Sequence, residues 1–255
     1  MKTFLNNKYT SFTVMVISIL LVIFSTEACK SSKIVKPLDT DTLYTNTESQ
    51  NISFEIQFTK GAEHNHPLMA IWIEDMDGKY IETLYVAESI AKGVFRHGNS
   101  SSGRWLPGAV RRPAALPVWS HSRGVKESDG LFVPTENTPM VDAVTGETPS
   151  GNFILIAKAV NALPDNINMF FEINQPWDWN EYWTNNKYPD DEHYKTSCQP
   201  ALVYQVEMHV RDTTEYTFDL VGRSSHNGSD GNIYKDLETI TTAKNITKEL
   251  RVELK

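Results

Sequence analysis

The chain has 255 residues, with 24 lysines and arginines against 32 aspartates and glutamates, and a formal net charge of -8 at pH 7. This acidic balance argues against nucleic acid and anionic lipid headgroups as partners, because both are bound by basic surfaces. The two cysteines, Cys29 and Cys198, allow at most one disulfide.

The first 28 residues have the features of an export signal. Two lysines precede an uncharged apolar run from Phe12 to Phe24, and the small residue Ala28 stands directly before Cys29. This run is shorter than the roughly 20 apolar residues that a membrane-spanning helix needs. We therefore expect residues 1–28 to be removed as a signal peptide.

Cys29 would then be the first residue of the mature chain. Its position after the signal resembles that of the acylated cysteine in bacterial lipoproteins. The resemblance implies a lipid anchor at Cys29 and a place in the cell envelope, facing the periplasm or the cell surface. The alternative is a disulfide between Cys29 and Cys198, but a cysteine at a signal boundary, followed by a polar segment, is poorly placed for a structural bridge.

Residues 29–51 are expected to form a flexible tether. From Lys30 onward they are rich in Ser, Thr, Asp and Lys and show no apolar periodicity. A coil of about 20 residues spans about 25 Å on average, which would lift a domain off a lipid surface. The remaining residues, 52–255, fall within the size of one ordinary domain.

From residue 52 onward, apolar and polar residues alternate with a period of two, which is typical of strands with one buried face. Asp77-Gly78 predicts a tight hairpin turn between two of these strands. Strands are expected at residues 52–58, 68–74, 79–86, 153–160, 169–173, 201–208, 216–221 and 250–254. About eight strands with turns between them predict a mainly β protein, an antiparallel β-sandwich of the immunoglobulin or fibronectin type; a closed barrel is the alternative.

Two long segments interrupt the strands, at residues 87–148 and 175–200. Loops of this length inside a compact domain are usually functional or packed as lids. Residues 89–92 would permit a short helical turn, although no capping residue fixes its ends.

Four segments resemble an uncharacterised family of predicted periplasmic proteins: residues 70–75, 116–121, 141–149 and 199–204. The most specific element is Asp-Ala-x-Thr-Gly-x-Thr-Pro at residues 142–149, in which Glu147 stands where the family more often has Ala. The similarity covers most of the chain from about residue 52. It implies a secreted β-rich domain to which no reaction is assigned.

The segment from Trp177 to Tyr194 is the predicted ligand-binding region, because it holds six aromatic residues and five carboxylates in 18 positions. Aromatic faces beside carboxylates and amides suit a sugar ring or an extended peptide. The predicted ligand-binding residues are Trp177, Asp178, Trp179, Tyr182, Trp183 and Tyr188. The alternative is that these aromatic side chains are buried and anchor a long loop against the sandwich.

A metal site is the next hypothesis. His64 and His66 lie two residues apart in an extended segment, and His121 with the acidic residues of 178–193 would add ligands for zinc or a similar divalent ion. A divalent metal is the one cofactor that these residues indicate. The alternative is that the histidines are ordinary surface residues.

The common enzyme motifs are absent: the chain has no Gly-x-Ser-x-Gly elbow, no His-Glu-x-x-His and no phosphate-binding glycine loop. We therefore assign no catalytic residues. The sequence favours a lipid-anchored, non-catalytic accessory or binding module of the bacterial cell envelope, with an envelope protein or a glycan as its partner. The alternatives are a carbohydrate or peptide binder that uses the aromatic segment, and a metal-dependent enzyme or metal carrier.

Overall fold

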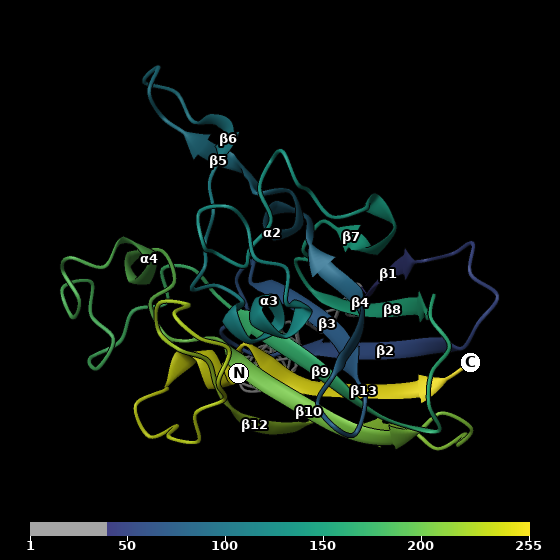
Figure 1. Cartoon of the computed structure of the whole chain (residues 1–255). Coiled ribbons are helices and arrows are strands. Elements are labelled where there is room, and N and C mark those ends of the chain that lie inside the picture. Colours follow the sequence, from purple (N-terminus) through teal and green to yellow (C-terminus); the bar gives the residue numbers. More distant parts are fainter. Residues whose placement is uncertain (1–39) are drawn as a thin grey trace, which may run out of the picture. The chain divides into compact units, whose positions relative to one another are not determined.

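The computed structural model describes residues 40–255, which form two β-sheets packed face to face (Figure 1). The first sheet has the strand order β1-β8-β2-β13-β11, and the second has the order β12-β10-β9-β3-β4-β7. The strands of the first sheet are β1 (Thr40–Thr45), β8 (Asn152–Lys158), β2 (Ser53–Lys60), β13 (Thr247–Leu254) and β11 (Tyr216–Thr217). Those of the second are β12 (Asp219–Arg223), β10 (Leu202–His209), β9 (Asn166–Asn174), β3 (Leu68–Glu74), β4 (Tyr80–Ala87) and β7 (Thr145–Gly146).

The main core lies between the two sheets. Along β2 every second side chain is buried, which explains the period-two pattern of its sequence. The Phe58 ring on β2 stacks on Phe153 of β8 at 4.8 Å and tilts against Phe171 of the opposite sheet at 5.9 Å. Aromatic side chains of both sheets therefore interdigitate at the centre of the sandwich.

A second apolar layer covers the outer face of the second sheet. Trp72 of β3 stacks on Phe170 of β9 at 5.1 Å, and both lie in a cluster with the short helices α2 (Glu88–Lys92) and α3 (Pro117–Arg123). Because β3 is buried on both faces, it is a continuous apolar run from Leu68 to Ile73 rather than an alternating one.

The predicted mainly β sandwich is confirmed. Each of the eight predicted strand segments overlaps a strand of the structure, and the Asp77-Gly78 turn joins β3 to β4, with Gly78 at a φ of 79°. The strands of residues 40–255 form separate open sheets, which excludes the closed barrel. The immunoglobulin or fibronectin type stays a prediction.

The prediction of one strand at residues 216–221 is wrong, because this segment forms two strands. It divides into β11, which pairs with β13 of the first sheet, and β12, which pairs with β10 of the second. Phe218 lies at the division and is buried in the main core. The chain therefore crosses from one sheet to the other at this residue, where one apolar side chain fills the space between them.

The predicted tether of residues 29–51 is wrong for its second half, and the domain begins before the expected residue 52. Strand β1 pairs in parallel with β8, from Thr40 opposite Asn152 to Thr45 opposite Ala157. The sequence does not predict β1, because it is an edge strand with mostly exposed side chains. It is held by its backbone hydrogen bonds rather than by an apolar face. Cys29 and the other residues from 1 to 39, including those predicted to form a signal peptide, lie outside the described residues.

A chain that begins at residue 52 is expected to be less stable than one that begins at residue 40. The loss of β1 removes its backbone hydrogen bonds to β8 and exposes that strand's edge, at a cost of about 2 kcal/mol and with a greater tendency to aggregate. Urea unfolding of the two chains tests this. Equal unfolding midpoints would show that β1 adds no stability.

The two long interruptions are not simple loops. Residues 87–148 contain α2, α3, the hairpin of β5 (Val94–Asn99) and β6 (Leu106–Ala109), and the 3-10 turn η1 (Asp142–Val144). Helix α2 includes residues 89–92, where the sequence permits a helical turn, and the β5–β6 hairpin projects away from the sheets (Figure 1). Residues 175–200 contain α4 (Glu192–Lys195), and η2 (Thr242–Asn245) precedes β13. Within residues 40–255, the helices are too short and too polar to cross a membrane.

Candidate functional site

Two connecting segments meet at one end of the second sheet. Strands β3 and β9 are antiparallel, and the pairing of Leu68 with Asn174 places the loop before β3 beside the segment after β9. The Gln175 side chain joins these segments: its Oε1 accepts the Asn65 N–H at 2.6 Å, and its Nε2 donates to the Glu63 carbonyl at 3.0 Å. This clamp fixes the positions of the residues on either side of it.

The β5–β6 hairpin supplies a further wall. Phe95 lies on β5, and the guanidinium of Arg112, a few residues beyond β6, sits over the Phe95 ring with its Cζ 4.1 Å from the ring centroid. Strand β7, which carries Gly146 and leads into Thr148, pairs with the end of β4 at the same place. The hairpin, the two clamped segments and the residues after β7 therefore converge.

Their convergence forms an open cleft of about 830 Å³, which we call the Trp105–Trp177 cleft. Its two tryptophans are 68 % and 63 % exposed, although large aromatic residues are usually buried. The lining residues are Asn65, His66, Leu68, Ser89, Phe95, Arg96, His97, Trp105, Arg112, Thr148, Pro176 and Trp177. The exposed indoles offer flat apolar faces to a ligand, and the amide and hydroxyl groups offer hydrogen bonds.

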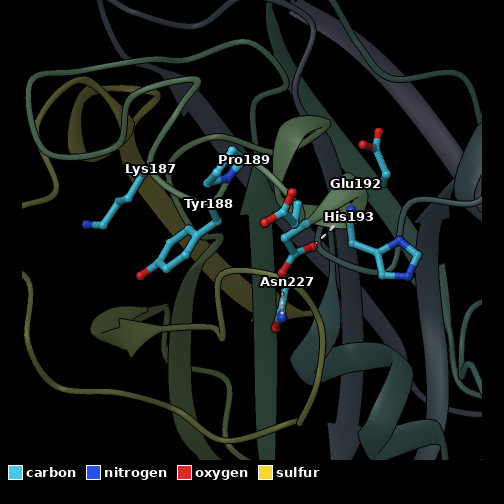
Figure 2. A pocket seen from close by; sticks show the side chains of 8 residues that line it. Lys187, Tyr188, Pro189, Glu192, His193 and Asn227 are labelled. Carbon is cyan, nitrogen blue, oxygen red and sulfur yellow. Dashed lines mark hydrogen bonds between the residues drawn. The ribbon is translucent and has the colours of Figure 1, made fainter.

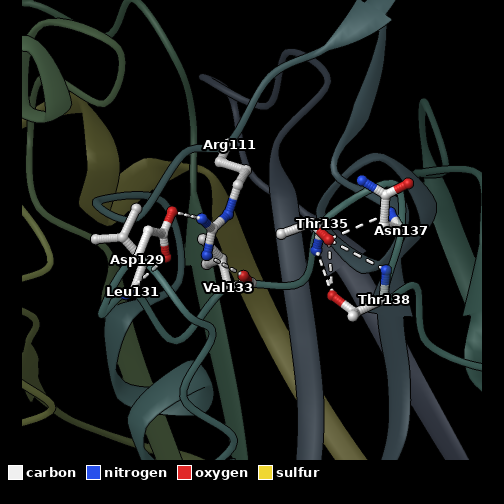
Figure 3. Close-up of polar contacts among 7 residues, drawn as sticks. All are labelled: Arg111, Asp129, Leu131, Val133, Thr135, Asn137 and Thr138. Carbon is white, nitrogen blue, oxygen red and sulfur yellow. Dashed lines mark hydrogen bonds and ion pairs between the residues drawn. The ribbon is translucent and has the colours of Figure 1, made fainter.

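The cleft is basic although the protein is acidic. None of its lining residues is a carboxylate, and the sequence has no Asp or Glu from residue 89 to residue 126. Arg111, which does not line the cleft, has its charge balanced: it pairs with Asp129 and donates to the Val133 carbonyl at 2.6 Å (Figure 3). Within residues 40–255, the neighbouring Arg112 and Arg96 form no ion pair. A cleft lined by one sign of charge attracts ligands of the opposite sign.

Two residues that line this cleft have a strained backbone conformation. His66 and Trp177 have φ values of 52° and 67°, in the left-handed region that residues other than glycine seldom adopt. Each such residue costs about 1–3 kcal/mol and persists only where its surroundings hold it, as the Gln175 clamp does here. Strain of this kind is typical of ligand-binding positions.

The predicted aromatic ligand site divides into two groups. Trp177 lines the cleft, and Tyr182 is 46 % exposed but lies outside it. Trp183 is only 5 % exposed and its Nε1 donates to Thr239 Oγ1 at 3.1 Å, while the Tyr188 ring stacks on His226 at 4.2 Å. Trp179 is half-buried against the main core. For these three residues the anchoring alternative describes the structure, so the prediction that they form an exposed platform is corrected.

Asp178 also has a structural role. Its Oδ1 accepts a hydrogen bond from Thr242 Oγ1, and burial raises its pKa. Its backbone carbonyl accepts from the Gln199 Nε2 at 3.1 Å. The residue therefore fixes the chain next to Trp177 rather than facing the cleft.

A second hollow of about 630 Å³ lies around α4, between Lys187 and His193 (Figure 2). Its central carboxylate, Asp191, caps α4 by accepting the N–H groups of His193 at 3.1 Å and Tyr194 at 3.0 Å. The other oxygen of Asp191 accepts from Asn227 Nδ2 at 2.8 Å. Because these contacts occupy the carboxylate, we consider this hollow a structural feature of the loop.

The structure does not bring His64, His66 and His121 together, which corrects the predicted metal site. His64 Nε2 lies 3.3 Å from the Pro149 carbonyl and His66 Nδ1 lies 3.0 Å from Asn65 Oδ1, whereas His121 is on α3 with its Nδ1 2.9 Å from the Pro117 carbonyl. Within residues 40–255, no three His, Cys, Asp or Glu side chains are grouped to hold a metal ion. His64 and His66 share the loop between β2 and β3, where their rings have different partners, and His121 lies on α3.

The hydroxyl groups of the serines beside His121 are hydrogen-bonded elsewhere, and the Cys198 thiol is buried. Ser120 Oγ donates to the Pro117 carbonyl at 3.1 Å, and Ser122 Oγ donates to Glu74, so neither bonds to His121. Cys198 is fully buried, and burial raises its pKa to about 12, which keeps the thiol protonated at neutral pH.

Sequence reasoning found Trp177 but missed Trp105, Phe95 and Arg112. The signal that would have found them is the run without carboxylates at residues 89–126, which contains seven lysines and arginines in an acidic protein. In comparisons with known proteins, no family model and no curated protein match this chain.

Proposed function

We propose that this protein is a non-catalytic binding module of the bacterial cell envelope, exported and held at a membrane by a lipid on Cys29. Its ligand lies in the Trp105–Trp177 cleft and presents a flat ring face, as a sugar or an aromatic ring does. The carbohydrate-binding hypothesis is thus kept, with its site moved from the aromatic loop to the cleft.

One observation carries this proposal: two tryptophans that are distant in the sequence both remain more than 60 % exposed and line one cleft. Leaving two indoles in water forgoes roughly 1.5–3 kcal/mol of burial free energy for each. A ring placed against them would recover part of that free energy. The half-buried Trp179 contacts Trp177 edge-on, with the two ring centroids 6.4 Å apart.

Trp177→Ala and Trp105→Ala are each expected to weaken ligand binding about 10-fold, since loss of one stacking face costs about 1.4 kcal/mol. The measurement is binding of the full chain to glycan and peptide arrays, followed by titration with the best ligand. Tyr182→Ala is the matched control, because Tyr182 is an exposed aromatic residue of the same segment that does not line the cleft. Binding that survives both tryptophan substitutions would disprove the assignment of the cleft.

A further inference from the structure

We propose that the Trp105–Trp177 cleft selects an anionic ligand, and that the phosphate, sulfate or carboxylate of the bound ring pairs with Arg112. This inference rests on the proposed function, because it assumes that the cleft holds a ring. It adds the chemical class of the ligand and names the residue that recognises it.

Arg112 is a half-buried cation without a partner. Within residues 40–255 its side chain forms neither an ion pair nor a hydrogen bond, and its Nε is buried without an acceptor. The Nε of Arg111 is also buried without an acceptor, but the terminal nitrogens of Arg111 and Arg223 each pair with an aspartate, whereas those of Arg112 have no partner within residues 40–255. Burying a donor without an acceptor costs about 1–3 kcal/mol, and more for a charged group. An acidic ligand group would remove this cost.

The surroundings of Arg112 prepare it for that role. The Phe95 ring supports the guanidinium, and a guanidinium over a ring keeps its N–H edges free to bind two oxygens in its own plane. Burial lowers the pKa of Arg112, but an arginine stays protonated at neutral pH.

The cleft also lacks groups that would repel an anion. Arg96, His66 and His97 line the same walls, and no carboxylate does. The half-buried guanidinium of Arg112 and the other basic side chains of the cleft therefore both favour a bound anion. This combination matches a ring that carries an acid group better than it matches a neutral sugar or a basic peptide.

A pair of dyes tests the inference directly. The anion 1-anilinonaphthalene-8-sulfonate and the neutral N-phenyl-1-naphthylamine share one ring system and differ by the sulfonate. In the full chain, Arg112→Gln is expected to weaken binding of the sulfonate dye at least 10-fold and to change binding of the neutral dye less than 2-fold. Trp177→Ala is expected to weaken both dyes. Equal effects of Arg112→Gln on the two dyes would overturn the inference and leave the proposed function standing.

The matched control is Arg104→Gln, because Arg104 is an arginine of the same hairpin segment that does not line the cleft. It is expected to change binding of either dye less than 2-fold. Insensitivity of both dyes to Trp105→Ala and Trp177→Ala would count against the proposed function itself.

A measurement on the unsubstituted chain keeps the test valid if Arg112→Gln does not fold. At constant ionic strength, millimolar inorganic phosphate is expected to displace the sulfonate dye but not the neutral one, and failure to do so would overturn the inference. Trigalacturonate and adenosine monophosphate then serve as competitors. Displacement by the first identifies an acidic saccharide, and displacement by the second an aromatic phosphate; displacement by neither would also overturn the inference.

Discussion

The stability of this protein is expected to fall as the pH rises from about 5 to about 8, and Glu172→Gln is expected to remove much of that dependence. Glu172 lies on β9 and is fully buried under α3. Burial raises its pKa to about 8, although its two backbone hydrogen bonds act in the opposite direction. The folded chain therefore binds a proton at this carboxyl in a pH range where the unfolded chain has released it.

The sign follows from this difference in proton binding. Below the ordinary pKa of a glutamate, near 4.5, both states hold the proton and the stabilisation is complete. Between that pH and about 8 only the folded state holds it, so the free energy of unfolding falls by about 1.4 kcal/mol per pH unit from this group. Above the folded-state pKa the buried carboxylate is charged and the loss is complete.

The position of Glu172 explains why a costly group is present. Helix α3 begins with Pro117 and has no side-chain cap, so its first N–H groups need acceptors. The two oxygens of Glu172 accept the N–H of Val118 at 3.1 Å and that of Trp119 at 2.8 Å. A glutamine retains only one acceptor oxygen, and Glu172→Gln is therefore expected to be the less stable chain at pH 5.

Urea unfolding of both chains at pH values from 5 to 9 measures this effect. At pH 5 the unsubstituted chain is expected to have the larger free energy of unfolding. Its advantage over Glu172→Gln is expected to shrink by several kcal/mol as the pH rises. Glu136→Gln is the control, because Glu136 is exposed in the insertion that also carries α3, and its curve should run parallel to that of the unsubstituted chain. Parallel curves for Glu172→Gln would show that Glu172 does not carry the pH dependence.

The parts of the fold that sequence could predict are those in which one face of a strand is buried. Residues 53–60 alternate, and the structure buries every second side chain of β2. Strand β1 could not be found in this way, because its pairing with β8 depends on backbone groups and its side chains are mostly exposed. Periodicity reports burial and is silent about strands that are held only by their hydrogen bonds.

The candidate site was predicted less completely, for a different reason. The sequence places six aromatic residues together between Trp177 and Tyr194, but it does not say which are exposed. In the structure Trp183 is buried, whereas Trp177, which has a left-handed backbone conformation, is exposed. Its partners Trp105 and Arg112 are distant in the chain and are joined to it only by the fold.

Gln199→Ala is expected to destabilise the protein by about 3 kcal/mol and to weaken binding in the cleft. Gln199 is 1 % exposed and its amide ties the segment of Trp177 to η2. Its Oε1 accepts from Asn180 Nδ2 at 3.0 Å and from the Thr241 N–H at 2.8 Å. Its Nε2 donates to the Asp178 carbonyl at 3.1 Å and to Thr242 Oγ1 at 2.6 Å.

The size of this effect depends on which partners keep other contacts. Asn180 Nδ2 also donates to the Thr239 carbonyl, and Thr242 Oγ1 also bonds Asp178, so both remain satisfied after the substitution. The Thr241 N–H loses its acceptor and the Asp178 carbonyl loses a donor. Two such losses at about 1–3 kcal/mol each, together with the cavity left by the side chain, give the expected total.

Gln205→Ala on β10 is the matched control, because the Gln205 amide makes one side-chain hydrogen bond, to Asn168 Oδ1 at 2.8 Å, and is only partly buried. It is expected to cost about 1 kcal/mol or less. Gln199→Ala should also weaken dye binding, because Asp178 is the neighbour of Trp177 and loses the contact that fixes its backbone. If Gln199→Ala lowers the stability as expected but leaves dye binding unchanged, the left-handed turn at Trp177 is held by Gln175 alone. If neither stability nor dye binding falls, the role of the Gln199 amide is disproved.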